Sequence, residues 1–529
     1  MKLMLKNCWK LISLLYPFIL AVDVVVIILT NNKDYLLPSQ AVRSSFIVLL
    51  ITALSWGSFF LITRDEYRSS YLCFLSVLLI FFYGYSYRLM NDLFHLEAHF
   101  KGNHLIVLGI WCLFLGVTSS GWMWNKIQNP RRFSTYFCAI LVISLLPRFF
   151  SISLFVFRST SASGNISIPS DLGHPDDLPV YSGSLPDIYY VILDSYGGKE
   201  VLLDKYYTDI SSFIKFLYDK GFYIAEKSHS NYLQTELSLA SSLNFNYLDQ
   251  FAEMKNPQRQ TLKELILHSK VRKYLERNGY MIIALASEDD YINLKDANVY
   301  YDEFVDINPF EEILLSVSVI STLDEFVNLG LPFQSYQTHR MWIQYTFDKV
   351  AEIPAIRGPK YVFVHIMMPH PPFVFDQDGT PVTPMQSFSM ADGNRFPGSN
   401  EDYIKGYAQQ VRFTNSKLQD MINVILEQSQ QPPIIIIQGD HGPRRLINWD
   451  SLGKNCIKEA ASIFNAYYFP NGGIPEIYPS ISPVNTFRLI FNHYFDTNLG
   501  LLDDRSYFSD FFHPYDFTEI TDIVDIDCQ

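Results

Sequence analysis

The chain has 529 residues, of which 48% are hydrophobic and 18% are charged, a composition too apolar for a disordered protein. Its net charge of −13 is unevenly distributed, because residues 1–158 carry +8 and residues 159–529 carry −21. The large acidic part lacks the basic surface that binds a phosphate backbone, so we expect no nucleic-acid partner. The sequence therefore predicts two dissimilar parts in one chain.

The first part contains stretches that are long and apolar enough to cross a bilayer, at 11–30, 43–63, 70–90, 104–124 and 133–157. A bilayer core of about 30 Å requires about 20 apolar residues in a helix. The first stretch has no small-residue cleavage pattern and is followed by four more, which favours a retained span over a signal peptide. Residues 1–158 are therefore predicted to form a transmembrane domain of five helices.

Basic residues favour one orientation of these spans. Lysine and arginine gather before the first span, between the second and third, and between the fourth and fifth, which indicates that these segments are cytoplasmic. Five crossings then place everything after Phe157 outside the cytoplasm. Asp23 lies inside the first span, where its carboxylate either contacts another helix or a lipid headgroup, or lies hydrated near the outer end.

The second part begins with residues 159–187, which are dominated by Ser, Gly, Pro and Asp and are predicted to be a linker. Residues 188–529 are expected to form one domain, in which loop 376–400 is either an active-site lid or an insertion. Strands are predicted at 188–194, 281–287, 361–368, 433–440 and 465–470, and helices at 208–220, 259–277, 338–350 and 402–428. Continuous apolar strands that alternate with helices indicate an α/β fold with a mostly parallel sheet covered on both faces.

The cysteines are few and widely spaced. The chain has six and no CxxC pair, which argues against a cysteine-based zinc module and against a disulfide-dense scaffold. Only Cys456 and Cys528 fall in the second part. They either form one bridge or remain free, and two free thiols are the interpretation that we favour.

Metal-binding types of residue follow three of the predicted strands. Asp194 ends the first apolar run, His370 follows the run at 361–368, and Asp440 and His441 follow four consecutive isoleucines. Ligands of open α/β sheets bind outside the carboxyl ends of the strands, and two carboxylates with an imidazole suit Zn²⁺ or Mn²⁺. Each residue alone also fits an ordinary turn or helix cap, so the prediction of a metal site rests on their combination.

Thr235, Ser238 and Ser241 recur at helical spacing near a predicted helix start. A metal-bound hydroxyl at a helix N-terminus would be activated as a nucleophile, and the exposed amides there would favour a phosphate. The alternative is a plain helix cap at Thr235, with the two serines packed on a face of small residues.

Along the chain, Asp194 after a strand, Thr235 at a helix start, His370 after a strand, and Asp440 and His441 after a further strand follow one another. This order resembles that of the alkaline phosphatase superfamily, and in particular its sulfatase-like membrane branch with lipoteichoic acid synthase and the phosphoglycerol and phosphoethanolamine transferases. The predicted spans before an extracytoplasmic domain are similar to that branch as well. The resemblance implies that Asp194, Thr235, Asp440 and His441 hold one divalent metal ion, Zn²⁺ or Mn²⁺, with Mg²⁺ as the alternative.

The resemblance also implies roles in a reaction. Thr235 would be the nucleophile, and His370 would contact the phosphate or leaving group and act as acid or base. Asn231 and Arg444 are predicted to bind the substrate with it. The chain lacks the C/S-x-P-x-R motif of true sulfatases, and residues 442–470 contain no histidine, so we expect neither ordinary sulfatase activity nor a second metal.

The predicted function is a membrane-anchored phosphotransferase that moves a phospholipid headgroup, of phosphoglycerol or phosphoethanolamine type, to an extracytoplasmic glycan or lipid acceptor. The alternatives are a phosphodiesterase or other ester hydrolase, which shares the first half-reaction, and a non-catalytic membrane scaffold. The expected location is the cell membrane, with a multi-pass anchor and a periplasmic or extracellular C-terminal domain.

Overall fold

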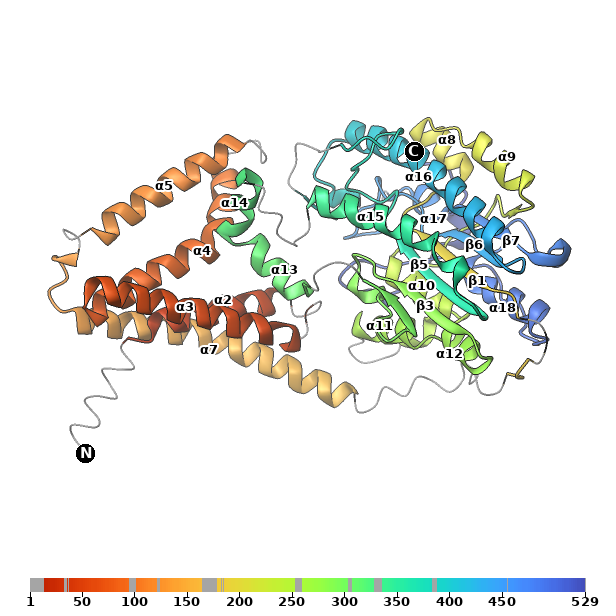
Figure 1. Cartoon of the computed structure of the whole chain (residues 1–529). Coiled ribbons are helices and arrows are strands. Elements are labelled where there is room, and N and C mark those ends of the chain that lie inside the picture. The colour runs from red at the N-terminus through yellow and green to blue at the C-terminus, as the bar shows by residue number, and fades with distance from the viewer. Residues whose placement is uncertain are drawn as a thin grey trace. The chain divides into compact units, whose positions relative to one another are not determined.

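The computed structural model describes residues 14–32, 36, 38–94, 101–120, 124–163, 178–181, 183, 185–252, 259–302, 307–327, 335–382, 388–453 and 455–528. The chain forms two compact units (Figure 1), one of Met1–Ile166 with Phe304–Gln334 and one of Ser167–Glu303 with Ser335–Gln529. The sequence had placed Phe304–Gln334 in the second domain. Residues 164–177, 182 and 184 of the predicted linker lie outside the described residues.

The first unit is built from apolar helices, namely α2 (Tyr16–Asn31), α3 (Ala41–Thr63), α4 (Glu66–Phe94), α5 (Lys101–Ser119) and α7 (Pro130–Ser163). Each predicted span coincides with one of these helices. Within the described residues, three helical segments are long and apolar enough to cross a membrane, Pro38–Thr63, Glu66–Tyr87 and Pro130–Leu154. Tyr16–Asn31 and His104–Ser119 are apolar but shorter, and residues 11–13 and 121–123 of the predicted spans are not described. Five crossings therefore stay a prediction.

Asp23 connects two of these helices. Its carboxylate, on α2, accepts a hydrogen bond of 2.8 Å from Arg148 Nη1 on α7, and the same nitrogen lies 2.9 Å from Ser144 Oγ. Asp23 is buried. An unpaired charge among apolar helices is costly, and each of these two residues lowers that cost for the other because their charges are opposite. Of the two alternatives for Asp23, the structure shows the link to another helix.

A helical hairpin from the middle of the chain packs into the first unit. Its helices, α13 (Pro309–Ser316) and α14 (Val319–Val327), contact α2, α3 and α4. Glu311 accepts from Arg43 through both carboxylate oxygens. Gly84 N donates to Val317 O at 3.0 Å, and a Cβ on Gly84 would lie 2.7 Å from that oxygen. The sequence did not reveal this hairpin, because its apolar face is covered by residues more than 200 positions away.

We expect a reporter fused after residue 160 to be extracytoplasmic and one inserted in the 125–132 loop to be cytoplasmic, because basic residues flank the second site. The hairpin gives a physical reason for the first expectation. It contacts the start of α3 and the second half of α4, which the charge pattern places toward the outside. Enzyme-reporter fusions at the two sites measure this, and finding both on one side of the membrane would remove the five-span topology.

The second unit is organised around a sheet of seven strands in the order β2-β7-β6-β1-β5-β3-β4. The strands are β1 (Ile188–Leu193), β2 (Tyr223–Ile224), β3 (Met281–Leu285), β4 (Val299–Tyr301), β5 (Lys360–Ile366), β6 (Ile434–Gly439) and β7 (Asn465–Tyr468). Pairs within β6-β1-β5-β3-β4 are parallel, whereas β7 runs antiparallel to both β6 and β2. The sheet is therefore mostly parallel, as predicted.

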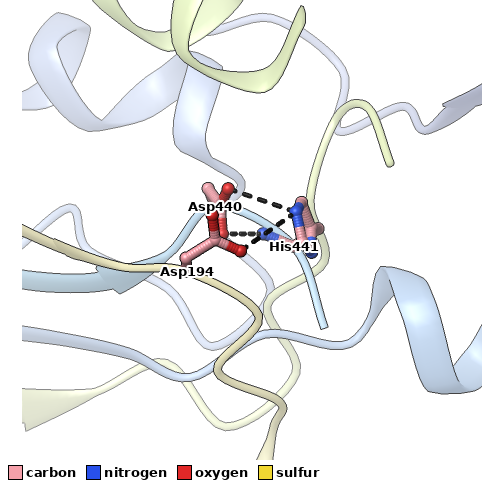
Figure 2. Close-up of side chains that lie close together, drawn as sticks. All are labelled: Asp194, Asp440 and His441. Carbon is pink, nitrogen blue, oxygen red and sulfur yellow. Dashed lines mark hydrogen bonds and ion pairs between the residues drawn. The ribbon is translucent and has the colours of Figure 1, made fainter. Parts of the chain in front are cut away.

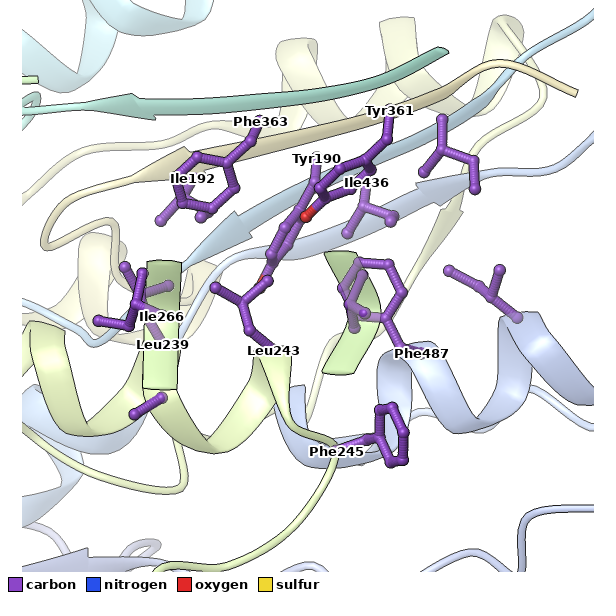
Figure 3. Packing of buried hydrophobic residues seen from close by; sticks show 14 of the residues in the cluster. Tyr190, Ile192, Leu239, Leu243, Phe245, Ile266, Tyr361, Phe363, Ile436 and Phe487 are labelled. Atoms are coloured by element: carbon purple, nitrogen blue, oxygen red, sulfur yellow. The ribbon is translucent and has the colours of Figure 1, made fainter. Parts of the chain in front are cut away.

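Helices cover both faces of this sheet. One face packs against α10 (Thr235–Leu243), α11 (Arg259–Leu267), α12 (Lys270–Arg277) and α18 (Pro483–Tyr494), and the other against α8 (Lys199–Tyr206), α9 (Ser211–Asp219), α15 (Tyr336–Val350) and α16 (Asn400–Gln428). Tyr190 and Ile192 of β1 point to the first face, where Leu239 and Leu243 of α10 meet them (Figure 3), while Tyr189 and Val191 point to the second. Burial on both faces explains the uninterrupted apolar sequence of the central strands.

Shorter elements complete the unit. They include α17 (Ile457–Ala461) and the pair β8 (Tyr507–Phe508) and β9 (Thr518–Glu519). The helix predicted at 259–277 is divided, because Ser269 caps a new helix by accepting from Arg272 N. The helix predicted at 208–220 is α9, and the chain turns after it at Gly221 with φ of +92°.

Cys456 and Cys528 form a disulfide, with Cα atoms 5.1 Å apart. The expectation of two free thiols was wrong. Seventy-two residues separate the two positions, and no local pattern reports that Val524 and Ile520 pack with Ile457 and so bring the C-terminus back. A bridge between such distant residues is typical of an oxidising compartment.

Candidate functional site

Asp194, Asp440 and His441 lie together at the carboxyl end of the sheet. Leu193 and Gly439 are paired in the register of β1 and β6, so the residues that follow them leave neighbouring strands side by side. One ligand atom from each of the three side chains lies within 4.8 Å of the others (Figure 2). All three are buried, with exposed fractions of 2%, 2% and 0%. We name this set the Asp–Asp–His cluster.

The hydrogen bonds of the cluster leave lone pairs facing one another. Asp440 Oδ1 accepts from the backbone N–H groups of Ser195 at 3.0 Å and His441 at 2.9 Å. Asp440 Oδ2 accepts no hydrogen bond from any described residue and lies 3.2 Å from His441 Nε2. His441 Nδ1 lies 2.9 Å from the carbonyl of Gly442, which assigns the proton to Nδ1 and a lone pair to Nε2.

The electrostatics of the cluster fit a bound cation. Burial raises the pKa of Asp194 to about 7. Burial, together with the neighbouring Asp194, raises the pKa of Asp440 to about 8, and burial lowers the pKa of His441 well below its usual value. Two carboxylates and an imidazole lone pair aimed at one point repel each other. A divalent ion would lower the raised pKa values of the two carboxyls and keep His441 unprotonated. The donor set and the unpaired Oδ2 therefore suit a metal ion.

Thr235 is the first residue of α10, and its Oγ1 lies 3.2 Å from His441 Nε2. The N-cap residue is Gln234, whose side chain does not cap the helix, so Thr235 is not the cap that the alternative interpretation required. Ser238 Oγ donates to the carbonyl of Asp440 at 2.7 Å, and Ser241 Oγ donates to Asn246 O at 2.8 Å. Of the hydroxyls of Thr235, Ser238 and Ser241, only that of Thr235 hydrogen bonds with a side chain of the cluster.

Arg444 lies near the cluster and is held by three hydrogen bonds. Nε donates to Asp392 Oδ2 at 3.0 Å, Nη1 to Leu233 O at 3.3 Å and Nη2 to His370 Nε2 at 3.1 Å. Its positive charge lowers the pKa of both Asp194 and Asp440 against the effect of burial. Arg444 therefore supplies a permanent cation where we predicted a substrate-binding residue.

His370 is neutral in this arrangement. Because a guanidinium only donates, His370 Nε2 must accept from Arg444, and Nδ1 hydrogen bonds with Pro371 O. Burial and the Arg444 charge lower the pKa of His370, to about 4. Both ring nitrogens are thus occupied, which favours a role in orienting Arg444 over the predicted role as acid or base.

Asn231 has partners within the fold for both ends of its amide. Nδ2 donates to Ser482 Oγ at 3.0 Å and Arg505 O at 2.8 Å, and Oδ1 accepts from Val484 N at 2.8 Å. Asn231 is fully buried. The structure therefore shows Asn231 joining three segments of the chain, where the sequence analysis had predicted a substrate contact.

Two buried residues near the cluster were missed. His365, on β5, has its Nε2 3.6 Å from Asp194 Oδ2 and without a hydrogen-bond partner in the described part of the chain. An imidazole inside a buried apolar strand was a usable signal, since such groups are costly without a partner. Asp392 lies in the long loop 376–400 and gave no sequence signal, because its partner Arg444 is 52 positions away.

No family model matches the chain, and no curated protein matches it. Among solved structures, it is similar to the C-terminal periplasmic domain of EcEptC from Escherichia coli in complex with Zn, with a TM-score of 0.42 and 12% identity over 66% of this chain and 96% of that chain. It is also similar to the integral membrane protein lipooligosaccharide phosphoethanolamine transferase A of Neisseria meningitidis, with a TM-score of 0.35 and 12% identity over 90% and 94% of the two chains. A phosphonate monoester hydrolase of Agrobacterium radiobacter gives a TM-score of 0.36 and 12% identity over 62% and 77%.

Proposed function

We propose that this chain is a membrane-anchored, metal-dependent phosphotransferase of the alkaline phosphatase superfamily. It moves a phospholipid headgroup of phosphoglycerol or phosphoethanolamine type to an extracytoplasmic glycan or lipid acceptor. The observation that carries the proposal is the position of Thr235 Oγ1, 3.2 Å from His441 Nε2 at the start of α10 and beside two buried carboxylates. A residue that only caps a helix does not require buried carboxylates and an imidazole beside its hydroxyl.

Asp194, Asp440, His441 and Thr235 would hold one divalent ion, Zn²⁺ or Mn²⁺, with Mg²⁺ as the alternative. Such an ion lowers the pKa of a hydroxyl and neutralises charge that develops on phosphoryl oxygens. Thr235 Oγ1 attacks phosphorus, so that a new O–P ester bond forms while the bond to the diacylglycerol oxygen breaks. The hydroxyl proton leaves to solvent, and the departing lipid oxygen takes up a proton. The oxygen of an acceptor hydroxyl then forms a bond to phosphorus while the bond to Thr235 Oγ1 breaks, the acceptor's proton leaves to solvent, and Thr235 Oγ1 takes up a proton.

Other features of the chain support a membrane setting. Three of its described helical segments meet the requirements for a span, which suits a donor that resides in the bilayer. The disulfide between Cys456 and Cys528 suits an oxidising compartment. A donor with its own phosphoester bond requires no nucleotide in that compartment.

The purified full-length protein, reconstituted with headgroup-labelled phospholipids and a candidate acceptor glycolipid, tests the proposal. We expect diacylglycerol and labelled acceptor to appear together, and both to disappear after chelation and return with the metal. Label released only as a soluble phosphate ester would identify the hydrolase alternative. Release of no label from either class of phospholipid by metal-loaded protein would contradict the proposal.

Replacing His370 by glutamine should retain most of the activity, because a glutamine Oε1 can still accept from Arg444. We expect kcat/KM to fall by less than about tenfold, the scale of one altered hydrogen bond. Since the lowered pKa of His370 keeps it neutral above about pH 4, the acidic limb of the pH–rate profile should not move. His370→Ala, which removes the acceptor, should be the more damaged variant. Loss of that limb in His370→Gln would restore the acid–base role.

A further inference from the structure

Asp392 is a buried carboxylate carried by the long loop between β5 and α16. It precedes a short 3-10 turn at Gly393–Arg395, and Gly393 N donates to its Oδ1 at 2.7 Å. Tyr403 Oη, from α16, donates to the same oxygen at 2.8 Å. Oδ2 accepts from Arg444 Nε at 3.0 Å. The loop and α16 thus hold the carboxylate through Oδ1, and the carboxylate holds Arg444 through Oδ2.

Arg444 cannot rotate freely within these contacts. Its Nε, Nη1 and Nη2 each have one partner, in Asp392, Leu233 and His370, and the guanidinium lies over the Trp449 ring, 5.1 Å from the centroid. A guanidinium has five N–H groups. One N–H on each terminal nitrogen therefore has no partner within the described part of the chain. These two donors are available to the oxygens of a phosphoryl group.

The position of Arg444 relative to the Asp–Asp–His cluster gives these donors a target. Arg444 Nη1 donates to the carbonyl of Leu233, two positions before Thr235 at the start of α10. It is 8% exposed, so little solvent screens it. A phosphoryl group next to Thr235 Oγ1 would carry its negative oxygens toward this cation. The carboxylate of Asp392 contacts Arg444 at Nε, so it does not occupy the terminal nitrogens.

We propose that Asp392 is a positioning residue for phosphoryl recognition. It holds Arg444 by Nε, so that the remaining Nη1 and Nη2 donors face the oxygens of the substrate phosphate. The inference rests on the proposed function and deepens it. It also gives the loop 376–400 a role, since that loop carries the Asp392 carboxylate that orients Arg444.

Asp392→Asn in the full-length protein tests this role, because asparagine keeps an oxygen near Arg444 Nε but removes the charge that holds it. The probe is inorganic phosphate, measured by its competitive inhibition constant and by direct titration of the metal-loaded protein. We expect phosphate affinity to weaken by about 10- to 100-fold, as for other groups that orient a ligand-binding side chain. KM for the phospholipid should rise in proportion, while the metal content stays unchanged.

Glu459→Gln is the matched control. Glu459 is fully buried, and it lies 3.4 Å from Nε of the adjacent Arg445 instead of Arg444. A purely structural effect of removing a buried acid next to an arginine should appear equally in both variants. We expect the phosphate affinity of Glu459→Gln to remain within about twofold of wild type, the scale of a residue outside the site.

Coupling with Arg444 distinguishes positioning from a general loss of order. In an Arg444→Lys background, Asp392→Asn should weaken phosphate binding by less than about threefold further, because two residues that act through one contact are not additive. If Asp392→Asn folds poorly, Tyr403→Phe tests the same contact, since it removes the hydroxyl that donates to Asp392 Oδ1 and keeps the charge. It should weaken phosphate binding in the same direction and by a smaller factor.

Three results would overturn the inference: unchanged phosphate affinity in both Asp392→Asn and Tyr403→Phe, an equal loss in Glu459→Gln, or full additivity with Arg444→Lys. Failure of the proposed function gives a different result. It would leave wild-type protein unable to release any label from phospholipid, whatever its affinity for inorganic phosphate.

Discussion

Replacing Thr235 by alanine should abolish headgroup transfer and leave the fold intact. The change removes the hydroxyl that lies 3.2 Å from His441 Nε2. Ser195 Oγ also contacts the cluster, but it donates to Asp194 Oδ1 at 3.0 Å and does not lie at the start of α10. We expect turnover of labelled phospholipid to fall by at least about 10³-fold, as when the nucleophile of a covalent mechanism is removed. Because Gln234 and not Thr235 is the N-cap of α10, no helix cap is lost, and the loss of one hydrogen bond should lower the free energy of unfolding by only about 1 kcal/mol.

Ser241→Ala is the control for this result. Ser241 lies in the same helix, is also buried, and donates to Asn246 O at 2.8 Å, so its loss should cost about 1 kcal/mol of stability and leave turnover near wild type. Ser238→Ala should have an intermediate effect, since Ser238 Oγ fixes the carbonyl of Asp440. Wild-type turnover in Thr235→Ala with an inactive Ser238→Ala would place the nucleophile one helical turn later.

Replacing Asp440 by asparagine should remove the metal and the activity together. Asparagine keeps an oxygen for the N–H groups of Ser195 and His441, but it replaces the unpaired Oδ2 by an amide that cannot bind a cation. We expect the metal content to fall from about one equivalent to below about 0.1, and turnover to fall by at least about 10³-fold. Elemental analysis of the purified full-length protein measures the first effect.

The same substitution has an opposite effect on metal-free protein. In the absence of a cation, burial and the neighbouring Asp194 raise the pKa of Asp440, so removal of this carboxyl should raise the thermal unfolding temperature of the metal-free form. Asp450→Asn is the control, since Asp450 is 61% exposed and pairs with Arg395 at the surface. An Asp440→Asn protein that retains one tightly bound metal ion would show that the cluster is not the metal site.

The central strands and the cluster could be predicted from the sequence because one physical cause determines both. Strands buried on two faces must be continuously apolar, so β1, β5 and β6 are recognisable as runs, and polar residues directly after such runs lie at one edge of the sheet. The pairing of Leu193 with Gly439 then places Asp194 beside Asp440. The start of α10 at Thr235 was visible from the spacing of its hydroxyls.

The remaining features depend on partners that are distant in sequence. The antiparallel direction of β7 follows from its pairing with β2 and β6, and local patterns do not encode direction. The disulfide of Cys456 and Cys528 requires a C-terminal segment to return across the domain. Asp392 had no local signal, since a single aspartate before Gly in a long loop is typical of an ordinary turn.

Detection of a covalent intermediate on Thr235 tests most directly whether Thr235 is the nucleophile of headgroup transfer. Metal-loaded wild-type protein should be mixed with headgroup-labelled phospholipid in the absence of an acceptor, quenched in acid, digested and mapped by mass spectrometry. We predict diacylglycerol release together with a phosphoryl-headgroup adduct on the peptide that contains Thr235, and no adduct in metal-free protein. Turnover with no adduct on Thr235 in a rapid-quench time course, or an adduct on another residue, would contradict the account.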